Sequence, residues 1–213
     1  MTTATKRKLT AAEDSASRSN RGVSLQDLVK VSAEDQADRG LYLGKTVPGF
    51  QVTGVEDGRA VGKATSVGPL DYCGYHTGRQ GQVKPGSPWH VEIECKETKA
   101  PSLSLNKKVI QPHQVKRMRR MHVDKPIVFV LACLRSGSGN PEYFAVEYPL
   151  LGPWYWAYYH ETWTDGKKPK ASIPIAVLRA HALAIPTYRR GSAIRLDLVT
   201  TIETLIAERT KRS

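Results

Sequence analysis

Residues 89–96 alternate apolar and polar side chains, a pattern typical of a half-buried β-strand. Side chains two positions apart on a strand share a face, so Glu94 and Lys96 should point the same way. The opposite face is apolar and is filled by Trp89, Val91, Ile93 and Cys95. A second stretch with a strand-like pattern, residues 70–75, carries Asp71. The pattern therefore predicts two strands that bring together two carboxylates and a lysine.

Two further stretches predict the rest of a sheet. Residues 127–134 are continuously apolar, as expected of a strand that is buried on both faces. Residues 143–146 follow a glycine- and serine-rich turn and predict another strand. An aromatic segment, residues 154–163, should pack beside the sheet.

Apolar residues at helical spacing predict three helices. The first should run from residue 24 to residue 39, where Gly40 ends it. The second should span residues 112–122, because Pro112 is well suited to a first helical position. The third should span residues 193–208. Strands interleaved with helices predict an α/β fold, with a central sheet flanked by helices.

Residues 45–70 differ in character from the rest of the chain. Two short strand-like runs, residues 50–53 and 59–61, flank the dipeptide Asp57-Gly58, a strong signal for a β-hairpin. The segment holds few large apolar residues, so the hairpin should bury little and project from the body. Basic residues are expected to be exposed along it: Lys45, Arg59 and Lys63.

The length and composition bound the organisation of the chain. The 213 residues suit one domain, and a hydrophobic content of 40% can supply its core. Residues 1–20 hold almost no large apolar side chains and predict a disordered basic N-terminal arm. The folded domain should therefore span residues 21–213, with residues 45–70 as a projecting part of it.

The net charge of +12 favours an anionic partner, either nucleic acid or an anionic membrane. No apolar stretch approaches the ~20 residues needed to span a bilayer, and the N-terminus lacks an apolar signal segment. These features favour nucleic acid, no membrane partner and a cytoplasmic location; a charge that only aids solubility is the alternative. The three cysteines have no paired spacing and predict buried thiols rather than a zinc site.

The candidate chemistry lies on the two acidic strands. Mg²⁺ prefers oxygen ligands in octahedral geometry, which Asp71, Glu94 and the backbone carbonyl of Ile93 can supply. Such an ion lowers the pKa of a bound water and stabilises the negative charge that develops at phosphorus. Lys96 shares the face of Glu94 and is expected to orient the attacking water. This order of an acid, a second acid and a lysine two residues later is typical of metal-dependent nucleases.

Neighbouring residues extend this candidate site. Glu92 shares the face of Glu94, either as a third metal ligand or as a surface salt-bridge partner. Gln114, in the first turn of the helix over 112–122, is expected to hold the metal-bound water or a phosphate. The same helix is basic and is expected to contact DNA phosphates. Its candidate DNA-binding residues are His113, Lys116, Arg117 and Arg120.

Several motifs together resemble RecU, the bacterial Holliday-junction resolvase family of the PD-(D/E)XK nuclease superfamily. Residues 19–25, SNRGVSL, resemble its N-terminal signature, and the strand with Asp71 resembles its metal-aspartate strand. Residues 94–99, ECKETK, are similar to the family's EAKETK run. His113-Gln114 follow the family's next block. The resemblance covers most of the length of the chain.

The resemblance implies a restriction-endonuclease-like fold with a mixed central sheet flanked by helices. In this fold residues 45–70 form a stalk that enters the centre of a four-way junction. It implies a symmetric homodimer with two active sites that require Mg²⁺, with Mn²⁺ as a substitute. Arg21 would match an arginine that contacts DNA, and Lys45 and Lys63 would match the basic character of the stalk. A branch-migration helicase or a recombinase is a further candidate partner.

Two departures from the family bear on the site. Gln26 stands where the family has a glutamate in the first helix, with Asp27 beside it. Asp27 is either a substitute metal ligand or only the cap of a helix that begins at Ser24. Leu70 replaces a threonine that usually precedes the aspartate. These changes suggest a divergent member of the family, such as a phage protein.

The sequence therefore predicts a Mg²⁺-dependent, structure-selective endonuclease that makes paired symmetric nicks in four-way DNA junctions during recombination and repair. Two alternatives remain open. One is a restriction-like or replication-fork nuclease of the same fold, and the other is a junction-binding protein without catalysis.

Overall fold

The computed structural model describes residues 24–46, 50–56, 59–64, 70–78, 88–123, 126–135, 140–160 and 169–212, with the backbone alone for 50–56 and 59–64. The predicted N-terminal arm, residues 1–20, lies outside these ranges, and so do Arg21 and the turn at Asp57-Gly58. The last residues of the predicted aromatic segment, 161–163, lie outside them as well.

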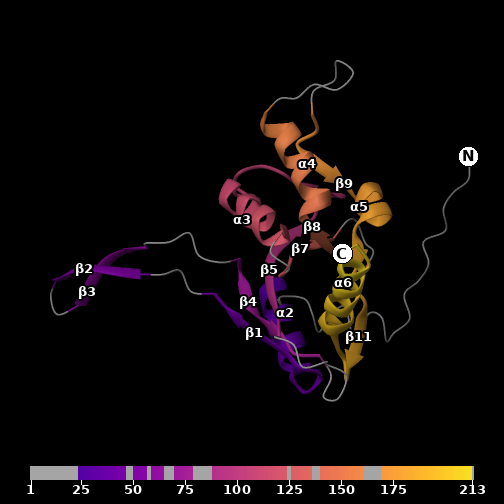
Figure 1. Ribbon diagram of the computed structural model, residues 1–213, viewed down its shortest axis with the longest axis horizontal. Coiled ribbons are helices and arrows are strands. Elements are labelled where there is room, and N and C mark those ends of the chain that lie inside the picture. The colour runs from indigo at the N-terminus through magenta and orange to yellow at the C-terminus, as the bar shows by residue number, and fades with distance from the viewer. Residues whose placement is uncertain are drawn as a thin grey trace, which may run out of the picture.

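A six-stranded mixed sheet forms the centre of the fold, with helices on both sides of it (Figure 1). The strand order is β1-β4-β5-β7-β8-β10, and all neighbours pair antiparallel except β5 and β7, which run parallel. The strands span Leu41–Lys45 (β1), Tyr72–His76 (β4), Trp89–Thr98 (β5), Ile127–Leu134 (β7), Glu142–Glu147 (β8) and Leu183–Ala184 (β10). The predicted α/β class with a mixed central sheet is confirmed.

Parallel strands require a crossover connection, and the one between β5 and β7 contains helix α3, Pro112–Val123. The other α-helices within the described ranges are α2 (Leu25–Glu34), α4 (Tyr148–Tyr159), α5 (Ile175–His181) and α6 (Leu198–Arg212). The predicted second helix is therefore confirmed, and the predicted aromatic segment falls largely within α4. Tyr155 of α4 is buried in one hydrophobic cluster with Val128 and Val130 of β7, which confirms the predicted packing beside the sheet.

The sheet separates two hydrophobic cores. On one face α2 and α6 pack against Val91 and Ile93 of β5, and on the other α3, α4 and α5 pack against the opposite side of the sheet. Strand β7 contributes to both cores, since its residues alternate between them and all eight are buried. The prediction that residues 127–134 form a strand buried on both faces is therefore confirmed.

The first helix is shorter than predicted. Helix α2 ends at Glu34, and a 3-10 turn, Ala37–Arg39, continues the chain to Gly40. Gly40 adopts a left-handed conformation with φ 82°, and a Cβ there would lie 2.4 Å from the carbonyl oxygen of Gly78. Gly40 thus ends this segment as predicted, because only glycine fits both the backbone angle and the close approach.

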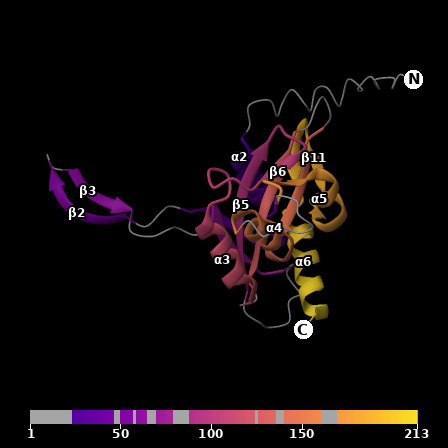
Figure 2. The ribbon, with the colours of Figure 1, turned by 90° about the horizontal axis from the view of Figure 1, so that it is seen from above.

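Strands β2 (Phe50–Glu56) and β3 (Arg59–Ala64) pair antiparallel as a separate two-stranded sheet, which confirms the predicted hairpin. The register shifts between Val52 and Gly54, as in a β-bulge. Figures 1 and 2 show this hairpin away from the central sheet, on the side where β1 and β4 lie.

The predicted helix over residues 193–208 is wrong at its start. Residues Ala193–Leu196 form strand β12, which pairs with β11, Thr187–Arg190, and helix α6 begins only at Leu198. The cause is Asp197, whose carboxylate accepts hydrogen bonds from the backbone nitrogen of Thr200 at 3.1 Å and from its hydroxyl at 2.8 Å. This side chain caps the helix, and a cap fixes where a helix starts.

Three more elements carry no strong pattern in the sequence. Strands β6, Ser102–Ser104, and β9, Ser172–Pro174, pair with each other, and β1 extends the central sheet beside β4.

Over the described parts of the chain, no helix is both long and apolar enough to cross a membrane.

Candidate active site

Asp71 and Glu94 face each other from two neighbouring strands. The antiparallel register of β4 and β5 pairs Tyr72 with Ile93, so one further step of the same register sets Asp71 opposite Glu94. Directly opposed residues of an antiparallel pair point to the same face, with Cβ atoms about 5 Å apart. The two carboxylates that the sequence singled out are therefore neighbours in the structure.

Asp71 is fixed at the point where β4 begins. Its Oδ2 atom accepts a hydrogen bond from the backbone nitrogen of Cys95 at 2.8 Å. Its backbone carbonyl accepts a hydrogen bond from the nitrogen of Thr46 at 2.9 Å, just beyond β1. The Asp71 carboxylate thus takes the place of a backbone carbonyl as the acceptor for the Cys95 N–H. This hydrogen bond holds the carboxylate at the end of the paired region of β4 and β5.

Glu94 is only 2% exposed and is held by two further side chains. Lys96 Nζ lies 2.5 Å from Glu94 Oε1, and Gln114 Nε2 donates a hydrogen bond to the same oxygen at 2.6 Å. Gln114 is itself oriented, because its amide oxygen accepts a hydrogen bond from the backbone nitrogen of Gln111 at 2.8 Å. The structure thus brings all four predicted catalytic residues together, with Asp71 opposite Glu94.

The electrostatics of the site favour a cation. Burial raises the pKa of Glu94 above its ordinary value, and the charge of Asp71 adds to this shift, while Lys96 opposes it. The fully ionised pair is therefore costly in the absence of a metal. A divalent cation between the two carboxylates would offset this cost, since it supplies the largest positive charge in such a site.

The donor set fits Mg²⁺. Two facing carboxylates supply the hard oxygen ligands that this ion prefers, and Lys96 and Gln114 restrain one of them. Ile93, whose carbonyl the sequence proposed as a third ligand, lies in β5 between β4 and β7 with its side chain fully buried in the core. The coordination by its carbonyl stays a prediction.

Asp27 serves as part of a helix cap. Ser24 Oγ accepts a hydrogen bond from the backbone nitrogen of Asp27 at 3.1 Å and donates one to Asp27 Oδ2 at 2.7 Å. The capping interpretation is therefore confirmed, and metal ligation by Asp27 stays a prediction.

Burial raises the pKa of Tyr72 to about 12, with contributions from both Asp27 and Asp71, so both carboxylates lie near this phenol.

Glu92 is a salt-bridge partner as predicted, but its predicted place at the surface is wrong. Its side chain is fully buried and accepts hydrogen bonds from Arg117 Nε and Nη2, each at 2.5 Å. Burial raises the pKa of Glu92, but hydrogen bonds from Arg117 and His90 outweigh it, so the net pKa is lowered. Arg117 thus serves a buried carboxylate, and the alternation of β5 alone did not show this.

The remaining predicted DNA-binding residues have different settings. Lys116 and Arg120 are exposed on α3, and Lys45 is exposed at the end of β1. His113 is half-buried, and burial together with the charge of Lys96 lowers its pKa. Arg21 and the side chains of Arg59 and Lys63 lie outside the described residues.

No protein-family model matches the chain, and no curated protein matches it. The resemblance to RecU therefore stays a prediction that rests on the motifs in the sequence.

Proposed function

We propose that this chain is a Mg²⁺-dependent endonuclease with a PD-(D/E)XK-type fold that makes paired nicks in four-way DNA junctions. The observation that carries the proposal is the register that sets Asp71 opposite Glu94, with Lys96 on the same face of β5. An acidic pair beside a lysine suits the hydrolysis of a phosphodiester, because it combines metal ligands with a hydrogen-bond donor for the attacked group.

In the proposed site, Asp71, Glu94 and the carbonyl of Ile93 would hold the ion. When bound, Mg²⁺ would supply a water of lowered pKa and positive charge beside the scissile phosphate. Lys96 lies close enough to Glu94 to donate to the attacking water or to a phosphate oxygen. Gln114 restrains Glu94 through its hydrogen bond, which keeps the carboxylate oriented.

The surfaces around the site support DNA as the partner. Helix α3 carries Gln114 into the site and exposes Lys116, Arg119 and Arg120 to solvent. Exposed basic side chains next to a metal site suit the phosphates of a bound strand. The β2–β3 hairpin is the proposed stalk for the centre of a junction, and a homodimer would supply two sites for two opposed nicks.

A labelled four-way junction tests the proposal. The wild-type protein should nick two opposed strands with Mg²⁺ or Mn²⁺, and chelation should stop cleavage. Asp71→Asn should bind the junction and leave it uncut. Glu34→Gln is a matched control, since Glu34 is an exposed acid of α2 in an i,i+4 pair with Lys30. Wild-type cleavage rates in Asp71→Asn would overturn the site assignment.

A second candidate is a junction-binding protein without catalysis. It is favoured by the absence of the family's glutamate at Gln26 together with the capping role of Asp27. A third is a restriction-like or fork nuclease of the same fold. Parallel assays on four-way, three-way and linear DNA separate the three candidates. Paired nicks at the crossover would support the junction resolvase, and cleavage of all substrates would support the restriction-like or fork nuclease. Binding without cleavage would support the junction-binding protein.

A further inference from the structure

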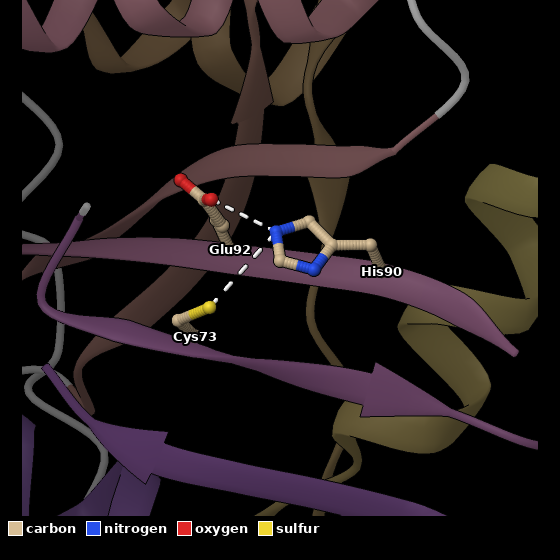
Figure 3. Close-up of side chains that lie close together, drawn as sticks. All are labelled: Cys73, His90 and Glu92. Carbon is tan, nitrogen blue, oxygen red and sulfur yellow. Dashed lines mark hydrogen bonds and ion pairs between the residues drawn. The ribbon is translucent and has the colours of Figure 1, made fainter.

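Three side chains that offer a sulfur, a nitrogen and an oxygen donor converge two residues along the strands from the acidic pair. Cys73 comes from β4, and His90 and Glu92 come from β5 (Figure 3). The register pairs Cys73 with Glu92 and Tyr75 with His90, so these side chains share the face that carries Asp71 and Glu94. The candidate nuclease site does not use them.

The donor atoms of this trio point to one place. His90 Nε2 lies 2.8 Å from Glu92 Oε1 and 3.9 Å from Cys73 Sγ, and the three atoms all lie within 4.8 Å of one another. Figure 3 shows the same ring nitrogen directed at both partners. In a catalytic triad the nucleophile and the orienting acid contact different ring nitrogens. Convergence on one nitrogen is instead the arrangement of ligands around a common centre.

The surroundings hold the trio in place and leave it accessible. Both carboxylate oxygens of Glu92 accept hydrogen bonds from Arg117, which orients the carboxylate and leaves one lone pair of Oε1 for a further partner. Metal-ligating carboxylates are commonly oriented by such hydrogen bonds. The His90 side chain is 40% exposed, so solvent reaches the site from that side.

We propose that Cys73, His90 and Glu92 form a binding site for Zn²⁺, with three protein ligands and a fourth position open to water. A thiolate, an imidazole and a carboxylate are the ligand types that Zn²⁺ takes, and three protein ligands with one open position is a common arrangement. Zn²⁺ binding displaces the thiol proton of Cys73 and the proton between His90 Nε2 and Glu92 Oε1, and both protons are released to solvent. Its donor set differs from the all-oxygen set at Asp71 and Glu94, so the two sites select different metals.

The position of this site gives it a structural consequence. Residues two apart on a strand are separated by about 7 Å, so the zinc site lies that far from Glu94 along β5. The ion joins β4 to β5 two residues after Asp71. Zinc binding therefore stabilises the pairing of the two strands that set the acidic pair opposite each other, and this consequence does not depend on nuclease activity.

Titration of the full chain with Co²⁺, a spectroscopic substitute for Zn²⁺, tests the proposal. The wild-type protein should develop a thiolate-to-cobalt charge-transfer band that saturates at one ion per chain and is displaced by Zn²⁺. Excess Mg²⁺ should leave the band unchanged, and Asp71→Asn should retain it. These readouts remain informative even where no DNA is cleaved.

Variants locate the ligands. Cys73→Ser should abolish the band, and His90→Ala should abolish saturation at one ion per chain. Cys95→Ala is the matched control, because the Cys95 side chain packs against the opposite face of the sheet, and it should keep the band. A wild-type protein that binds Co²⁺ without the band, or a Cys73→Ser variant that retains it, would overturn the proposal.

Discussion

The carboxylate of Asp71 accepts a hydrogen bond from the backbone nitrogen of Cys95 at 2.8 Å, which locks the first acid of the site to the strand that carries the second. Cys95 directly follows Glu94, so this contact anchors Asp71 next to the second acid. The carboxylate of Glu94 is oriented separately, by the side chains of Lys96 and Gln114.

Glu94→Gln should stabilise the metal-free protein at pH 7. The folded-state pKa of Glu94 is raised by burial, so the folded protein holds this proton to higher pH than the unfolded chain does. Stability is then lost as pH rises from the unfolded value of about 4.3 through the folded value. Urea denaturation in the presence of chelator should show a higher free energy of unfolding for the variant than for the wild type, with a difference that grows with pH. A variant less stable than wild type at pH 8 would contradict this account.

Glu92→Gln should destabilise the fold by about 3 kcal/mol, near the lower end for breaking a buried ion pair, because Arg117 keeps some solvent contact. The lowered folded-state pKa of Glu92 also shows that its ionised carboxylate stabilises the fold. This stabilisation is present at neutral pH and is lost as the pH falls through the folded-state pKa. Glu97→Gln on the same strand is the control. Glu97 pairs with Arg135 at a more exposed position, so Glu97→Gln should lower the stability by at most about 1 kcal/mol.

Gln114→Ala should weaken the response to Mg²⁺ while leaving the fold intact. The Gln114 amide restrains Glu94 at 2.6 Å, and loss of such an orienting partner typically lowers metal affinity about 10–100-fold. The Mg²⁺ concentration for half-maximal cleavage should rise accordingly. An unchanged Mg²⁺ dependence would show that Gln114 does not orient the ligand.

Lys116→Ala and Arg120→Ala should weaken junction binding without abolishing cleavage at saturating protein. Both side chains are exposed on α3. If each neutralises one phosphate, each variant should reduce the slope of log affinity against log salt by about 1. Lys30→Ala on α2 is a control whose slope should match the wild type, and a slope unchanged in the α3 variants would place the DNA elsewhere.

Deletion of residues 50–62 should reduce the preference for four-way junctions over linear duplex. These residues make up most of the β2–β3 hairpin, which forms its own sheet away from the central one. The central sheet should keep its stability, since the deleted strands do not belong to it. Competition binding between the two DNA forms measures the effect, and an undiminished preference would rule out the stalk.

Much of the site could be predicted because its residues lie on strands with clear periodicity. The alternation in residues 89–96 set Glu94 and Lys96 on one face, and the structure places them there. The position of Asp71 opposite Glu94 depends on strand register, which the sequence left open.

Other features were out of reach for physical reasons. The pairing of Arg117 with Glu92 joins residues 25 positions apart, and an alternating strand does not reveal that its polar face is covered by a helix. Cys73 and His90 are 17 positions apart, so no metal-ligand spacing was present in the sequence to find. Asp197, by contrast, was readable as a helix cap from Thr200 three residues later.

Anomalous diffraction from a crystal soaked in Mn²⁺ tests the central claim most directly. The account predicts an anomalous peak between the carboxylates of Asp71 and Glu94, within coordination distance of both. The absence of a peak between these two carboxylates, with manganese bound only elsewhere, would contradict it, and so would carboxylates that point away from a common ion.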